Sequence, residues 1–96
     1  MTLGKIPIIL SKVRKEDIDK QILRSAVLAE LDAINLYEQM ASLTENTSLK
    51  RVLLDVAKEE KEHVGEFQYL LLKFDPQQAE ELEDGMKEVK ELLDES

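Results

Sequence analysis

Residues 47–74 read TSLKRVLLDVAKEEKEHVGEFQYLLLKF. Along this stretch apolar side chains recur three or four positions apart, which is the spacing of one face of an α-helix. The positions on that face are Leu49, Leu53, Val56, Glu60, His63, Phe67 and Leu70. Asn46 or Thr47 can cap the start of the helix. The stretch therefore predicts one long amphipathic helix, with a carboxylate and an imidazole in the middle of its apolar face.

A second long helix is predicted upstream, over residues 16–43. Its apolar face has the same helical spacing. The positions on that face are Ile22, Ala26, Glu30, Ala33, Tyr37 and Met40. Only residues 44–46 separate the two helices, and so short a link makes them antiparallel neighbours in an αα-hairpin. Each helix of the hairpin therefore has a carboxylate in its apolar face.

The rest of the chain adds a shorter helix and a leading arm. Asp75, Pro76 and Gln78 form a helix-start pattern, so we expect a helix over residues 76–93. Residues 1–14 contain a glycine and a proline, which disfavour helix, and we expect an extended arm there. The whole chain is predicted to be one all-α domain.

The composition excludes several classes of function. The 96 residues contain no cysteine, which excludes disulfides, thiolate metal sites, iron–sulfur clusters and cysteine nucleophiles. The formal net charge of −8 argues against nucleic-acid binding, which needs clustered Lys and Arg. No apolar run has the length of a membrane span or the features of a signal peptide. We therefore expect a cytoplasmic protein with neither nucleic acid nor membrane among its partners.

Glu30, Glu60 and His63 are the candidate metal ligands. A carboxylate in an apolar helix face needs a partner, because burying an unpaired charge is costly. Glu60 and His63 are three positions apart, so both side chains lie on one helical face and can share an ion. Carboxylate and imidazole ligands without a thiol suit iron, manganese or zinc. The alternative is a hydrogen-bonded core histidine beside a solvated run of charges over residues 59–62.

The ligand count is that of half a di-iron site. A di-iron carboxylate bundle takes one Glu from each of two helices and a Glu-x-x-His pair from each of two others. This chain supplies one helix of each kind, and a symmetric dimer supplies the rest. Two hairpins also build a core that one short chain cannot. The predicted fold class is therefore an all-α hairpin with a shorter C-terminal helix, dimerising into a four-helix bundle.

Two further residues of the first helix are candidates for supporting roles. Tyr37 lies two turns after Glu30 on the same face, where its hydroxyl can hydrogen-bond a ligating carboxylate. The alternative for Tyr37 is an ordinary core tyrosine. Asp32 lies just off the apolar stripe, and it either draws cations toward the site or belongs to the plain surface.

Residues 29–37, AELDAINLY, and residues 59–63, EEKEH, resemble segments of the encapsulated ferritins. These proteins are two-helix members of the ferritin-like superfamily that are carried inside encapsulin nanocompartments. The resemblance covers about residues 16–95, nearly the whole chain. Either segment alone is a weak indicator of this family. The two segments together, at this separation in the sequence, are fairly specific for it. The resemblance implies a ferritin-like four-helix bundle made by two chains.

The resemblance also implies roles for the candidate residues. The ferroxidase ligands of the family fall on Glu30, Glu60 and His63, and its supporting tyrosine falls on Tyr37. One of the acidic positions at which the family admits metal falls on Asp32. The neighbouring acidic position of that pair is an alanine in this chain, which departs from the family pattern. The resemblance therefore extends to the three metal ligands but not to the complete metal-uptake site of the family.

The function implied by the resemblance is iron oxidation for storage. Members of the family form ring-shaped decamers of five dimers, oxidise Fe(II) with O2 at a di-iron centre, and pass Fe(III) into an encapsulin shell. The partners implied are a second copy of this chain and the encapsulin shell protein, and the cofactor implied is iron. Residues 91–96 lack the docking motif of free cargo proteins, so the sequence also fits either a truncated chain or a domain cut from a fusion ahead of a shell protein.

Three other functions remain open at this stage. A rubrerythrin-like diiron peroxidase uses similar ligands, although it normally needs a cysteine-containing electron donor. A zinc- or manganese-binding storage or sensor protein would use the same ligand types without turnover. A metal-free helical adapter would leave four carboxylates facing one another across an apolar interface, which is unfavourable.

Overall fold

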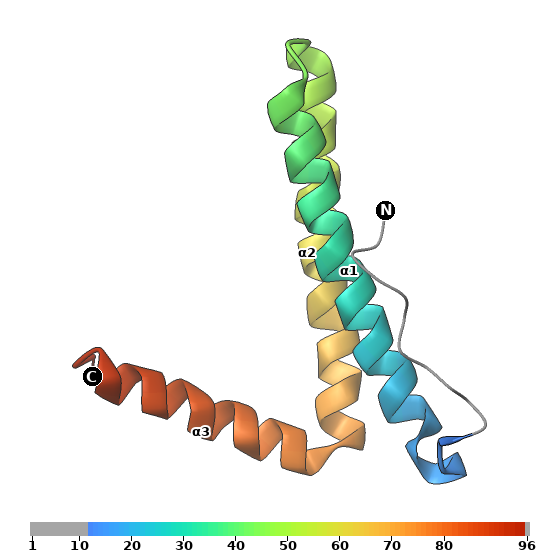
Figure 1. Ribbon diagram of the computed structural model, residues 1–96, viewed down its shortest axis with the longest axis vertical. Coiled ribbons are helices and arrows are strands. Elements are labelled where there is room, and N and C mark those ends of the chain that lie inside the picture. The colour runs from blue at the N-terminus through green and yellow to red at the C-terminus, as the bar shows by residue number, and fades with distance from the viewer. Residues whose placement is uncertain (1–11, 96) are drawn as a thin grey trace.

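The computed structural model describes residues 12–95, and over that range the regular secondary structure is all helical, with short non-helical links between the helices. The elements are the 3-10 helix η2 (Lys15–Asp17) and the α-helices α1 (Ile18–Leu43), α2 (Thr47–Phe74) and α3 (Pro76–Leu92). The predicted all-α fold, with a hairpin and a shorter C-terminal helix, is confirmed (Figure 1). Within the described range, no helix combines the length and apolarity needed to cross a membrane.

The arm expected over residues 1–14 lies almost wholly outside the described residues. Arg14 is extended, with φ −65° and ψ 144°, and its carbonyl accepts a hydrogen bond from the Asp17 N–H at 2.9 Å. Helix α1 begins at Ile18, slightly later than the sequence pattern predicted, because η2 forms the first turn. The acidic residues of this turn still lie where the positive end of the helix dipole favours them.

Helices α1 and α2 lie side by side and antiparallel, as the short link requires (Figure 1). The link is fixed by its own side chains. The Asn46 N–H donates to Thr44 Oγ1 at 3.1 Å, and Asn46 Oδ1 accepts the Leu49 N–H at 2.9 Å. Of the two caps that the sequence offered, Asn46 is the one used, because its side-chain oxygen satisfies a free N–H of the first turn.

Helix α3 leaves the end of α2 and points away from the hairpin (Figure 1). The change of direction occurs at Asp75, whose N–H closes α2 on the Leu71 carbonyl at 2.8 Å. Asp75 Oδ1 then accepts the Gln78 N–H at 3.2 Å and starts α3, with Pro76 in its first turn. The predicted cap is confirmed, and a second contact from Arg24 of α1 joins the Asp75 carboxylate at 2.6 Å.

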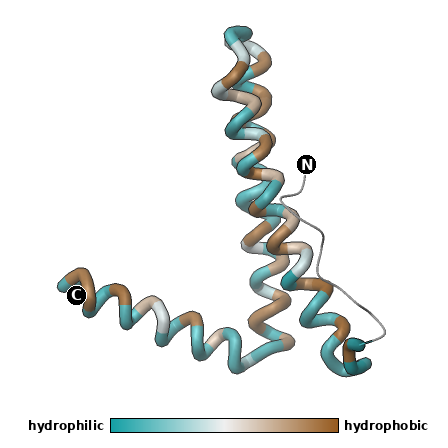
Figure 2. The backbone as a smooth tube through the Cα atoms, in the orientation of Figure 1, coloured by the Kyte–Doolittle hydropathy of each residue, from teal (hydrophilic) through white to brown (hydrophobic). Residues whose placement is uncertain are grey.

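The core of the isolated chain is small. Its buried apolar residues within the described range are Leu23, Ile34, Ala41, Ala57 and Leu71. None of these five residues is among the apolar-face positions that the sequence pattern predicted. Ile22, Leu49 and Leu70 remain roughly half exposed, because one antiparallel contact covers only one side of each helix. Hydrophobic positions recur along all three helices (Figure 2), and large apolar side chains are exposed on each of them, such as Leu43, Val52 and Leu92.

Candidate metal centre

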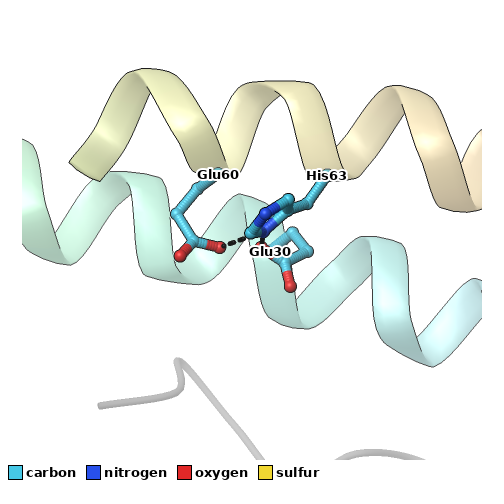
Figure 3. A group of neighbouring side chains, drawn as sticks. All are labelled: Glu30, Glu60 and His63. Carbon is cyan, nitrogen blue, oxygen red and sulfur yellow. Dashed lines mark hydrogen bonds and ion pairs between the residues drawn. The ribbon is translucent and has the colours of Figure 1, made fainter. Parts of the chain in front are cut away.

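The structure brings together the three residues that the sequence singled out as metal ligands. Glu30 reaches across from α1, and Glu60 and His63 reach toward it from α2 (Figure 3). Nδ1 of His63 lies 3.3 Å from Oε2 of Glu30 and 3.3 Å from Oε2 of Glu60. One ligand atom from each residue lies within 4.8 Å of the other two. The cluster is therefore compact enough for one cation to reach all three side chains.

The hairpin itself explains why these residues meet. Glu30 and Glu60 lie equally far along the chain from Glu45, the middle residue of the link. In an antiparallel pair of helices, two such positions come to the same height. His63 follows Glu60 by three residues and so lies on the same face of α2. The pairing of α1 with α2 thus brings the carboxylate from one helix to the carboxylate–imidazole pair on the other.

The chemistry of this cluster favours a cation. The side chains of Glu30 and Glu60 are only 20% and 18% exposed, whereas that of His63 is 45% exposed. Nδ1 carries at most one proton and can donate it to only one of the two carboxylates well. A divalent cation is instead attracted by both carboxylates and by the imidazole lone pair. Oxygen and nitrogen ligands without sulfur fit iron, manganese or zinc.

A cavity of about 380 Å³ opens beside the cluster. Glu30 and His63 line it together with Glu66 and Phe67. Glu66 is exposed and follows His63 by three residues, so the two side chains share a helical face. Glu66 was not predicted from the sequence, because one more acidic residue in a helix rich in Glu looks like plain surface. Its spacing from His63 was the signal that could have found it.

Asp32 and Tyr37 do not join the cluster. Asp32 follows Glu30 by two residues, so it lies about 200° around the α1 axis from it. It is only 6% exposed, so it does not belong to the plain surface, and its Oδ2 has no hydrogen-bond partner within the described part of the chain. Tyr37 is half-buried. In residues 12–95 the hydrogen bonds of Glu30 and Glu60 go to His63 and not to the Tyr37 hydroxyl.

The other charges near the motif behave as solvated residues. Glu59, Lys61 and Glu62 are all exposed, as expected for the polar face of α2. Lys61 forms an ion pair with Glu38 of α1 at 3.3 Å, on a surface where such a pair adds little stability. The charge run over residues 59–62 thus divides into three solvated side chains and one, Glu60, that belongs to the cluster.

A helical hairpin with a carboxylate–histidine cluster between its helices is an arrangement typical of ferritin-like proteins. Residues 21–95 match the family described as Rubrerythrin, and the chain belongs to this family. The chain also superposes on the crystal structure of the encapsulated ferritin domain from Pyrococcus furiosus with a TM-score of 0.83. The two are 49% identical, and the match covers 100% of this chain and 99% of that one. The expected resemblance to encapsulated ferritins is thereby confirmed.

Two longer proteins are similar in sequence. The chain is 60% identical over 78 residues to the ferritin-like–encapsulin shell fusion protein of Pyrococcus furiosus, a match covering 81% of this chain and 22% of the relative. It is also 42% identical over 72 residues to the encapsulin nanocompartment cargo protein EncC of Myxococcus xanthus. That match covers 72% of this chain and 55% of the relative. The chain thus spans about a fifth of one relative and about half of the other.

Proposed function

We propose that this chain is half of a ferroxidase, an Fe(II):oxygen oxidoreductase whose di-iron centre is completed by a second copy of the chain. The observation that carries this proposal is the convergence of Glu30, Glu60 and His63, with one ligand atom of each within 4.8 Å of the others. Two copies supply four carboxylates and two imidazoles, which is the ligand set of a di-iron carboxylate bundle. Iron is then the substrate as well as the occupant of the site.

The uncovered apolar surface supports the second copy. Val52, Leu70 and Phe74 are exposed and lie at helical spacing on the face of α2 that carries His63. Exposed apolar patches of this kind mark interaction surfaces. A two-fold axis beside His63 would pack this face on itself and form a four-helix bundle, with the ligands of both chains at its centre.

Each ligand has a distinct role in this proposal. Glu60 and His63 of each chain would hold one Fe(II), and Glu30 of each chain would supply a further carboxylate to the pair. When bound, two Fe(II) ions supply two electrons, which with two protons reduce O2 to hydrogen peroxide and leave two Fe(III). The protein fixes the ligands and excludes much of the water around Glu30 and Glu60, and this needs neither a nucleophile nor a general base.

The relatives favour a role in iron storage inside an encapsulin nanocompartment. One is named as a fusion with the shell and the other as a cargo protein. We propose that this chain acts in the cytoplasm inside such a shell, as a ring of five dimers, and that its product Fe(III) is stored in the shell interior. An open ring cannot enclose mineral, so the shell is the partner that this function requires.

Anaerobic titration with Fe(II), followed by exposure to air, tests the proposal. We expect two Fe(II) bound per dimer and oxidised faster than in protein-free buffer, with absorbance and native mass as readouts. Oxidation no faster than in buffer would favour a metal-free adapter, and tight binding without turnover would favour a storage or sensor protein.

The match to the rubrerythrin family favours one second candidate, a diiron peroxidase. This enzyme would reduce hydrogen peroxide rather than O2. The chain has no cysteine, so the electrons would come from a separate donor protein. Comparing the rates of Fe(II) oxidation by hydrogen peroxide and by O2 distinguishes the two, since a peroxidase reacts faster with the peroxide.

A further inference from the structure

We propose that Glu66 receives divalent cations from solvent and passes them to the ligand cluster. This inference rests on the proposed metal centre and adds a residue to it. Glu66 lines the cavity of about 380 Å³ together with Glu30 and His63, but its carboxylate lies outside the group whose ligand atoms lie within 4.8 Å of one another. It therefore borders the cavity without belonging to the candidate site itself.

The burial of the acidic side chains sets the order in which a cation meets them. Glu66 is exposed, whereas the side chains of Glu30 and Glu60 are four-fifths covered. Glu66 lies about 60° around the α2 axis from His63, so it stands at the edge of the face that a second chain would cover. A hydrated cation that enters the cavity from solvent therefore meets the Glu66 carboxylate first. From there Glu30 and His63 line the same cavity, so the cation can exchange its ligands step by step without leaving the cavity.

The rest of the cavity wall offers nothing that would hold or repel the cation. The fourth lining residue is Phe67, which supplies no oxygen or nitrogen ligand from its side chain. The lining contains neither a lysine nor an arginine. Charged walls of one sign raise the local concentration of counter-ions and speed their association. Glu66 adds negative charge at the outer end of this wall, which is where such an effect accelerates loading.

Asp32, the position implied by resemblance, is a poorer candidate for this role. It is 6% exposed, so solvent has little access to its carboxylate. It also lies on the opposite side of α1 from Glu30 and does not line the cavity. Cation uptake through Asp32 would therefore require a second route to the cluster, whereas Glu66 already shares a cavity with it.

Stopped-flow binding of Co(II) to the full chain tests the role of Glu66. Co(II) is stable in air and its visible spectrum reports the ligands around it, so the readout is independent of iron oxidation. We expect Glu66→Gln to slow Co(II) binding by about threefold to tenfold, with unchanged final stoichiometry and spectrum. Glu62→Gln removes one charge from an exposed position next to His63 and outside the cavity, and it is expected to bind at the unmodified rate.

Each other outcome overturns the inference. Equal slowing in Glu66→Gln and Glu62→Gln would mean that only the overall charge matters. Slowing in Asp32→Asn with a normal rate in Glu66→Gln would place uptake on the other side of α1. A changed spectrum or stoichiometry in Glu66→Gln would make Glu66 a permanent ligand. Failure of the unmodified chain to bind Co(II) at all would remove the metal centre, and the role of Glu66 with it.

Discussion

Nδ1 of His63 faces a carboxylate oxygen from each of the two long helices, both at 3.3 Å. The sequence predicted this cluster because all three residues interrupt apolar faces near mid-helix, where a polar side chain is costly without a partner. It missed Glu66, because the spacing of Glu66 from His63 indicates a shared helical face but not the cavity beside it. Spacing thus predicts which side chains meet, but a cavity depends on how the neighbouring side chains pack.

Removing a single metal ligand from α2 should abolish Fe(II) oxidation and leave the helical fold intact. We expect His63→Ala and Glu60→Ala to lower the rate of Fe(II) oxidation to that of protein-free buffer, because each variant lacks one ligand of each ion. His63 is 45% exposed, so its removal leaves no large void and the far-UV circular dichroism should barely change. Glu62→Ala, exposed on the same helix, is the matched control. Unchanged rates in the first two variants would exclude these residues from the mechanism.

Replacing the Asp32 carboxylate with an apolar side chain should stabilise the folded chain. Its Oδ2 has no hydrogen-bond partner in the described part of the chain, although the residue is buried. A buried unsatisfied polar atom costs about 1–3 kcal/mol. We therefore expect Asp32→Leu, which replaces the carboxylate with an apolar group, to raise the free energy of unfolding by about 1 kcal/mol in urea titrations. A loss of stability would instead mean that the carboxylate has a favourable partner, such as a bound cation.

Among the elements, α3 depends most on a single residue. Asp75 ends α2 and caps α3, and Arg24 of α1 donates to its carboxylate at 2.6 Å. The sequence predicted the cap from the spacing of Asp75 and Gln78, but it held no sign of Arg24. That contact joins residues 51 positions apart, and only the register of the hairpin brings them together. Local sequence patterns therefore predict where a helix begins. Contacts between residues far apart in the sequence, such as Arg24 with Asp75, depend on tertiary packing.

The Asp75 contacts predict a stability loss at low pH. The Gln78 N–H and then the Arg24 guanidinium hold the pKa of the Asp75 carboxyl below its ordinary value of 3.8, against the opposing effect of burial. A lowered folded-state pKa contributes stability that is present above pH 3.8 and is lost as the pH falls through the lowered value. Urea midpoints measured from pH 7 downward should therefore fall in this range because of Asp75.

Two variants separate the charge of Asp75 from its capping. Asp75→Asn keeps a capping side chain and loses the ion pair with Arg24. It should be less stable than the unmodified chain at pH 7, and the difference should shrink as the pH falls below 3.8. Asp75→Ala should be less stable still, because α3 also loses its cap. A constant difference in stability between the unmodified chain and the Asp75→Asn variant at every pH would refute the contribution of the charge.

For the whole molecule, the small core and the large exposed apolar surface have the same cause, because a single chain covers only one side of each helix. Five apolar residues are buried within the described range, whereas large hydrophobic side chains are exposed on every α-helix. The sequence predicted apolar faces but not which neighbour covers them. The sequence pattern placed Ile22 on the apolar face, but Leu23, about 100° further around the helix, is the buried residue of the two. Both are apolar, so the pattern does not show which of them faces α2. The second chain that we propose would cover the face that α1 and α2 leave open.

Metal binding should therefore strengthen association of the chain. If each ion takes ligands from two chains, it binds the dimer more tightly than the single chain, and metal then shifts the equilibrium toward the dimer by mass action. With free metal at about 100 times its dissociation constant, each site contributes about 2.7 kcal/mol, which is about a hundredfold tighter association. Sedimentation velocity with a chelator and then with Co(II), at a chain concentration near the dissociation constant of the dimer, should show growth of the larger species.

The same measurement on His63→Ala ties that growth to the cluster. This variant keeps the exposed apolar face of α2 and lacks an imidazole at the proposed interface, so its association should no longer respond to Co(II). A metal response that persists in His63→Ala would place the linked ion elsewhere. An unmodified chain with the same oligomeric state under chelator and under Co(II) would break the link between metal and assembly, and the apolar faces alone would then account for any dimer.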